Sequence, residues 1–230
     1  MESNRRTARI AGLLYLIVVL AGIFSLAYVP SRIDMAGDAA TTVRNLIAHE
    51  SLFRLGIVAG LVCYTAFLML PLALYKLLSP YGKQAAGLMV AFAVVSVPIA
   101  FVVTLNKFDV LSLLSGADHL RAFGTEALQA QVMLSLGAYG DGLLVVQIFW
   151  GLWLFPFGYL VFKSGIIPRA LGVLLMLGCF GYLINFIGRV LFPGYAESVI
   201  AGWVRLPAAV GEIGTCLWLL VMGAREPKAD

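Results

Sequence analysis

Charged residues are scarce in this chain: Asp, Glu, Lys and Arg make up 12% of its 230 residues, whereas hydrophobic residues make up 61%. A soluble domain of this length typically carries roughly 25% charged residues. The composition therefore excludes an ordinary soluble protein. It favours a single domain, residues 1–230, that is embedded in a lipid bilayer.

Cysteine and histidine are too few and too scattered for a metal or disulfide framework. The three cysteines, Cys63, Cys179 and Cys216, are odd in number, lie in apolar stretches and form no CxxC pair. His49 and His119 each stand beside an acidic residue outside the apolar runs, where we interpret them as solvated or interfacial side chains. The sequence predicts no metal site and no cofactor.

Catalytic and nucleotide-binding motifs are missing as well. The chain has no HExxH, no GxSxG in an apolar helix and no glycine-rich phosphate loop after a strand. The net charge of +4 does not indicate nucleic acid, because the basic residues stand singly or in pairs at the edges of apolar stretches, where lipid headgroups lie. We predict no catalytic residue, no nucleic-acid partner and the lipid bilayer as the surroundings.

Long apolar runs are what the chain has in abundance. Six of them reach or exceed the ~20 residues that a helix needs to cross the hydrocarbon core. They cover residues 9–29, 53–76, 84–106, 138–162, 168–190 and 204–223. The first run also fits a cleaved signal peptide with a small-x-small site at Ser25-Leu26-Ala27, but its length favours a membrane span. The sequence predicts an all-α, multi-pass membrane protein with six transmembrane helices.

The distribution of Lys and Arg predicts the orientation, since basic residues collect on the cytoplasmic side of a membrane. They flank the two short connections and both ends of the chain: Arg5, Arg6, Arg9, Lys76, Lys83, Lys163, Arg169, Arg225 and Lys228. Both termini are therefore predicted to be cytoplasmic, with longer loops around 30–52, 107–137 and 191–203 facing outward. Two alternatives stay open for 107–137. It forms short interfacial helices at 109–115 and 125–136, or it extends the fourth span as a helix that breaks at its glycines.

Ionisable residues inside the spans point to a site, because a charge at bilayer depth costs at least ~2.5 kcal/mol without a partner. Glu212 lies near the middle of the sixth span, and Arg205 precedes it by two helical turns on the same face. Asn185 and Arg189, four residues apart, share a face of the fifth span. These residues predict a polar pocket that opens outward, with Glu212 and Arg189 as its central pair. Its six predicted members are Glu212, Arg189, Asn185, Asp141, Arg205 and Arg54.

A second interpretation of the same polar residues stays open. They also fit a structural ion-pair network that sets the helix register and binds nothing. In that case Arg54, Lys107 and Asp141 extend toward the outer membrane boundary. Glu212 fits this interpretation poorly, because a short carboxylate at mid-depth does not reach the headgroups.

Small residues predict where helix backbones approach one another. Gly56 and Gly60 form a GxxxG pair in the second span, and Gly178, Gly181 and Gly188 give the fifth span a thin side. In a chain with six spans, such pairs favour internal packing over a dimer interface. We therefore predict that these glycines contact other helices of the same chain.

Three segments carry a resemblance to a known family. They are RIAGLLYL at Arg9–Leu16, the motifs GYL, KSG, IPR and LG within Gly158–Gly172, and Gly211-Glu212 followed by LWLL at Leu217–Leu220. On these segments, the chain resembles the bacterial membrane proteins catalogued as domain of unknown function 4386. The resemblance implies a compact six-helix membrane protein, an acidic residue at Glu212 and no assigned activity. The third span departs from the family, since Ala91-Phe92-Ala93-Val94 stands where an arginine-containing stretch is frequent.

Together these features predict a function in binding. The expected protein lies in the bacterial plasma (inner) membrane and binds a small or amphipathic ligand in its outward-facing polar pocket, with transport of that ligand as an extension. The alternative is a non-catalytic accessory or partner subunit of another membrane protein. An intramembrane enzyme is the third hypothesis.

Overall fold

The structure, a computed structural model, describes residues 2–33, 35 and 37–224. Arg225 and Lys228, which contribute to the predicted orientation, lie outside the described residues. Within the described part, six helical segments are long and apolar enough to cross a membrane. They cover Asn4–Ile33, Glu50–Tyr81, Lys83–Leu113, Thr125–Ser164, Arg169–Leu191 and Val199–Val221. The predicted all-α, multi-pass fold with six membrane-spanning helices is confirmed.

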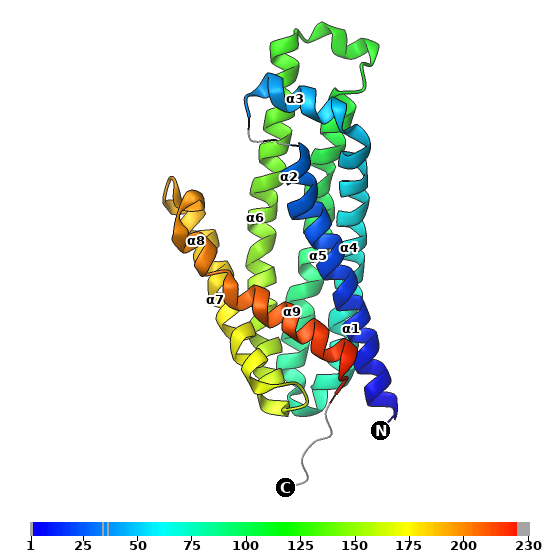
Figure 1. Cartoon of the computed structure of the whole chain (residues 1–230), viewed down its shortest axis with the longest axis vertical. Helices are drawn as coiled ribbons and strands as arrows, with labels where there is room; N and C mark the ends of the chain where they lie inside the picture. Colours follow the sequence, from blue (N-terminus) through cyan, green and yellow to red (C-terminus); the bar gives the residue numbers. More distant parts are fainter. Residues whose placement is uncertain (1, 34, 36, 225–230) are drawn as a thin grey trace. The chain divides into compact units, whose positions relative to one another are not determined.

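Figure 1 shows the helices in chain order. Their bounds are α1 (Glu2–Ile23), a π-helical turn (Phe24–Tyr28), α2 (Val29–Ile33), α3 (Ala39–Ala48), α4 (Glu50–Leu78), α5 (Lys83–Leu113), α6 (Thr125–Ser164), α7 (Arg169–Leu191), α8 (Val199–Trp203) and α9 (Leu206–Val221). Short 3₁₀ turns occupy Ser79–Tyr81, Asp118–Ala122 and Tyr195–Glu197.

The helices form two compact units. Unit 1 contains the chain up to Ile17, the segment Thr65–Val97 and the chain from Leu144 onward; unit 2 contains Val18–Tyr64 and Pro98–Leu143. Four helices, α1, α4, α5 and α6, therefore contribute one part to each unit. That the whole chain is a single domain stays a prediction.

The structure decides between the alternatives for 107–137. Asp109 belongs to the end of α5, and the segment from Thr125 belongs to α6, so the interfacial-helix alternative is wrong and the helical extension is confirmed. The expected breaks at Gly137, Gly140 and Gly142 are absent from α6. Glycine destabilises a helix interior by only about 1 kcal/mol relative to alanine, which the packing of a helix of 40 residues outweighs.

One helix in the loop 30–52 was not predicted. In α3, Asp38 is the N-cap, and its carboxylate accepts hydrogen bonds from the Thr41 backbone N–H at 2.9 Å and from the Thr41 hydroxyl at 3.0 Å. Val43 and Leu46 lie on the face of α3 that packs against the apolar core, and both are buried. The cap residue and the apolar face together explain why this loop folds as an amphipathic helix.

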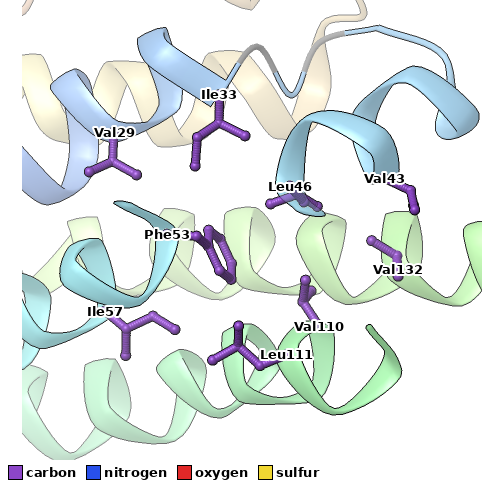
Figure 2. Packing of buried hydrophobic residues seen from close by; sticks show 9 residues of the cluster. All are labelled: Val29, Ile33, Val43, Leu46, Phe53, Ile57, Val110, Leu111 and Val132. Carbon is purple, nitrogen blue, oxygen red and sulfur yellow. The ribbon is translucent and has the colours of Figure 1, made fainter. Parts of the chain in front are cut away.

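The core of unit 2 lies under α3. Figure 2 shows apolar side chains from five helices converging around Phe53. They are Val29 and Ile33 of α2, Val43 and Leu46 of α3, Phe53 and Ile57 of α4, Val110 and Leu111 of α5, and Val132 of α6. On the next turns of α4, Gly56 lies against Val29 and Gly60 against Ser25, whose hydroxyl donates to the Gly56 carbonyl at 2.7 Å. The internal role predicted for this GxxxG pair is confirmed.

Replacing Asp38 with alanine is expected to loosen α3 alone. The hydrogen bonds from Thr41 hold the pKa of the Asp38 carboxyl below its ordinary value. This stabilisation is therefore fully present above the unfolded pKa of about 4 and is lost as the pH falls through the lower folded pKa. Hydrogen exchange of residues 39–48, corrected for the intrinsic effect of pH, should be faster in Asp38→Ala at neutral pH and should accelerate in wild type on acidification.

The control for this prediction is Asp109→Ala, which removes another exposed carboxylate of unit 2. Exchange in residues 39–48 should stay at the wild-type rate in this variant. Equal exchange in all three proteins would show that the apolar face alone holds α3.

In unit 1, small residues let the helices that follow α7 approach its backbone. A Cβ atom built on Gly178 would stand 2.8 Å from the Ala208 Cα atom, and one on Gly188 would stand 2.6 Å from the Tyr195 ring. Between them, Gly181 lies against the Val204 carbonyl at the turn before α9. In Figure 1, α9 accordingly runs beside α7. The predicted thin side of this helix is confirmed as the face that packs on α9, on the turn before α9 and on the 3₁₀ turn at Tyr195.

The other contacts of unit 1 use glycine in the same way. Gly158 of α6 and Gly172 of α7 face each other, since a Cβ atom on Gly172 would stand 2.7 Å from the Gly158 carbonyl oxygen. Gly12 of α1 lies against α9, where its Cβ atom would stand 2.6 Å from the Leu220 backbone nitrogen. These close approaches bring α1, α7 and α9 together around Glu212.

Candidate functional site

A pocket of ≈ 120 Å³ opens beside α9 in unit 1. Its lining residues are Tyr182 of α7 and, from the start of α9, Arg205, Ala208, Ala209 and Glu212. Arg205 is the N-cap residue of α9, and Glu212 follows it by two turns on the same helix face. Two alanines between the charged residues leave the space open. The volume far exceeds the ~10–15 Å³ that one water needs, so the pocket admits a small polar group.

Glu212 is held from one side by Tyr15 of α1. The Tyr15 hydroxyl donates a hydrogen bond to Glu212 Oε1 at 3.3 Å, which is long for a bond of this type. Among the described residues, no group donates to the other carboxylate oxygen, Oε2. The carboxylate therefore keeps most of its capacity to accept hydrogen bonds for whatever enters the pocket.

Aromatic side chains fix the position of Tyr15. Its ring centroid lies 6.3 Å from that of Trp153 and 6.5 Å from that of Phe157, both of α6. Trp153 stacks on Phe157 at 5.1 Å and meets the edge of Phe67 of α4 at the same distance. Since Tyr15, Trp153 and Phe157 are each at most 1% exposed, this cluster is a rigid support for the hydroxyl that contacts Glu212.

Arg205 and Glu212 line one pocket without pairing. Within the part of the chain that the structure describes, no ion pair joins them, and neither side chain forms an ion pair elsewhere. The Tyr182 hydroxyl likewise has no hydrogen-bond partner among the described residues. The pocket thus presents an acceptor, a cation and a phenol that have no ion pair or hydrogen bond with one another, beside a helical segment long and apolar enough to cross a membrane.

Comparisons with known proteins identify the family. A family model described as "Domain of unknown function (DUF4386)" matches residues 10–223. The chain belongs to the DUF4386 family. It is also 32% identical over 153 residues to an "Uncharacterized protein" of Archaeoglobus fulgidus, a match that covers 66% of this chain and 74% of the relative. No solved structure matches the chain.

The family assignment confirms the resemblance and adds no activity. All pocket residues, Tyr182 and Arg205 to Glu212, lie inside the matched segment.

Two further predicted site residues lie on α7. Asn185 is 3% exposed, and its Oδ1 atom has no hydrogen-bond partner among the described residues. It lies about one turn beyond Tyr182 but does not line the pocket. Arg189 is exposed in the last turn of α7. Arg205, rather than Arg189, is therefore the arginine that shares the pocket with Glu212.

The remaining two predicted site residues belong to unit 2. Arg54 is exposed and pairs with Glu50, one turn away on α4, with its Nε atom 2.7 Å from Glu50 Oε1. Asp141 is exposed on α6. Neither lines the pocket, and both agree with the alternative that places them at the membrane boundary.

Three residues of interest were absent from the predicted site. Tyr15 and Tyr182 are polar aromatic residues within spans, and Tyr15 lies in the RIAGLLYL motif, so a weak signal was present. Lys107 was placed at the membrane boundary in the structural alternative, with its side chain extended outward; the structure instead buries this residue, which is 5% exposed. Among the described residues, no group of three or more His, Cys, Asp and Glu side chains could hold a metal ion.

Proposed function

We propose that this DUF4386 protein binds a small or amphipathic ligand that carries a positive and a negative group. The supporting observation is that Glu212 and Arg205 line the same pocket while neither forms an ion pair with the other. Two such charges in a membrane-spanning helix are costly unless a complementary group reaches them. A ligand with both charges compensates both residues at once.

Each pocket residue has a distinct role in this proposal. The Glu212 carboxylate accepts hydrogen bonds from an ammonium group of the ligand, and the hydroxyl of Tyr15 holds the carboxylate in place. The Arg205 guanidinium binds a carboxylate or phosphate, which its planar fork matches with two parallel hydrogen bonds. The exposed apolar side chains of Leu206, Val210 and Ile213 on α9 offer a surface for an apolar tail.

We further propose the orientation and location that the positive residues indicate. With both termini in the cytoplasm, the turn that carries Arg205 lies toward the outer side of the membrane, and the pocket opens outward. In a bacterial host this membrane is the plasma membrane. Binding on this side is a first step for transport, which follows only if the ligand also reaches the cytoplasmic side.

Glu212→Gln is expected to abolish binding while the protein stays folded. Glutamine keeps the shape of the side chain and can still accept the bond from Tyr15, but it no longer attracts a cation. Gentle extraction from native membranes followed by native mass spectrometry should give a discrete bound mass on wild type and none on Glu212→Gln. Glu197→Gln, at an exposed position of the same unit, should retain the bound mass.

Three results would contradict the proposal. They are bare protein in every sample, the same lipids on every sample, and a stoichiometric protein partner on wild type and Glu212→Gln alike. The first two favour the structural ion-pair interpretation. The third favours an accessory subunit.

A further inference from the structure

A lysine is buried among aromatic rings in unit 2. Lys107 of α5 is 5% exposed, and its Nζ atom lies 4.1 Å from the ring centroid of Tyr139 of α6. The ring of Phe53 of α4 lies 5.9 Å from the same nitrogen. Phe53 belongs to the apolar core of this unit (Figure 2), so the ammonium group lies at the margin of that core.

The acidic side chains that the structure describes in unit 2 do not neutralise this lysine. Asp38 caps α3, and Glu50 pairs with Arg54. Asp109, Asp118, Glu126 and Asp141 are exposed, and none of them forms an ion pair with Lys107. Among the described residues, no oxygen accepts a hydrogen bond from its Nζ atom either.

Cation–π contacts compensate this burial only in part. The faces of two rings attract the positive charge, but the three N–H donors of an ammonium group need oxygen acceptors. A buried cation without an anionic partner remains strongly unfavourable. An anionic oxygen group that approaches Nζ satisfies both the charge and the donors.

We propose that Lys107 anchors a second binding site, which takes the phosphate or carboxylate group of an anionic compound. The surroundings favour a compound with an apolar body, because Val110 and Leu111 follow on the next turn of α5 and the whole segment lies in a membrane-spanning helix. The rings of Phe53 and Tyr139 form the apolar walls beside the charge. This site uses no residue of the Glu212 pocket and does not depend on the function proposed for that pocket.

The test measures thermal unfolding of the purified protein in a neutral detergent. The probe is dodecyl phosphate, and inorganic phosphate is titrated in parallel. Dodecyl phosphate should raise the unfolding temperature of wild type, and Lys107→Gln should bind it at least about tenfold more weakly because a charge-assisted contact is lost. The control, Arg54→Gln, removes an exposed cation of the same unit and should respond as wild type does.

The two probes distinguish the source of the anionic group. A response to dodecyl phosphate at concentrations where inorganic phosphate has no effect supports an anionic lipid or amphiphile. An equal response to both supports a free anion at the same site. An unchanged response in Lys107→Gln, or no response of wild type to either probe, overturns the proposal.

A second measurement covers the case in which Lys107→Gln does not fold. Wild-type protein is acetylated with an amine-reactive reagent, and the modification of each lysine is followed by mass spectrometry. Bound dodecyl phosphate should slow the modification of Lys107 and leave that of Lys163, an exposed lysine of α6, unchanged. Equal rates for Lys107 with and without the probe overturn the proposal.

Discussion

Substituting leucine for Gly181 is expected to abolish the folded state of unit 1. Gly181 lies against the Val204 carbonyl, so even a Cβ atom collides with the backbone at the turn between α8 and α9. Overpacking a well-packed interior typically costs about 1–3 kcal/mol, and a collision with backbone cannot be relieved by rotating a side chain. The measurement is the yield of monodisperse protein in detergent together with its thermal unfolding midpoint.

The matched control is Gly87→Leu. Gly87 is an exposed glycine of α5, and a Cβ atom added to it would meet no other atom within 4 Å. Leucine is also a better helix former than glycine. The thermal unfolding midpoint of Gly87→Leu should equal or exceed that of wild type. A wild-type midpoint for Gly181→Leu would show that the turn before α9 does not rest on the Gly181 face of α7.

Replacing Arg205 with glutamine is expected to weaken ligand binding. The ligand's acidic group would enter the pocket and find no cation. Hydrogen bonds to a charged group contribute about 1.5–3 kcal/mol, and because Arg205 is exposed the lower end applies, a loss of about tenfold in affinity. The fold should persist, because the Arg205 side chain is exposed and forms no ion pair among the described residues. Native mass spectrometry gives the fraction of protein with bound ligand, and a titration gives the affinity once the ligand is identified.

Arg189→Gln is the informative control for Arg205. Both arginines were predicted as pocket residues, but only Arg205 lines the pocket. Arg189→Gln, in the last turn of α7, should therefore bind as wild type does. A larger loss of ligand binding in Arg189→Gln than in Arg205→Gln would mean that the ligand binds nearer the end of α7.

The sequence could predict that Arg205 and Glu212 share one face, because this relation depends only on their spacing along a single helix. Residues seven apart on a helix share a face whatever surrounds the helix, and both residues stand out chemically from an apolar span. The contact of Tyr15 with Glu212 joins residues 197 positions apart. It depends on the rotation of α1 and α9 about their axes. In lipid this rotation leaves little trace in the sequence, because side chains that face the bilayer are as apolar as those that face another helix.

The same reason explains why the sequence did not predict that Lys107 is buried and Asp141 exposed. Both lie near the ends of predicted spans, where a charged side chain is equally compatible with a boundary position and with burial. The structure buries Lys107 between Tyr139 and Phe53 and exposes Asp141. Helix continuity across Gly137 was misjudged because the low helix propensity of glycine is a weak local preference, which the packing of the long helix α6 overrides.

The sequence by itself determined the class of this protein, the number of its membrane-spanning helices and the helix that carries the central carboxylate. Each of these follows from the length of apolar runs relative to the hydrocarbon thickness and from residues within one helix. Only the tertiary structure decided which of the predicted polar residues share a pocket, that Tyr15 and Tyr182 join them, and that Lys107 is buried. Those outcomes depend on which face each helix turns toward its neighbours, and glycine contacts such as that of Gly181 with Val204 set this geometry.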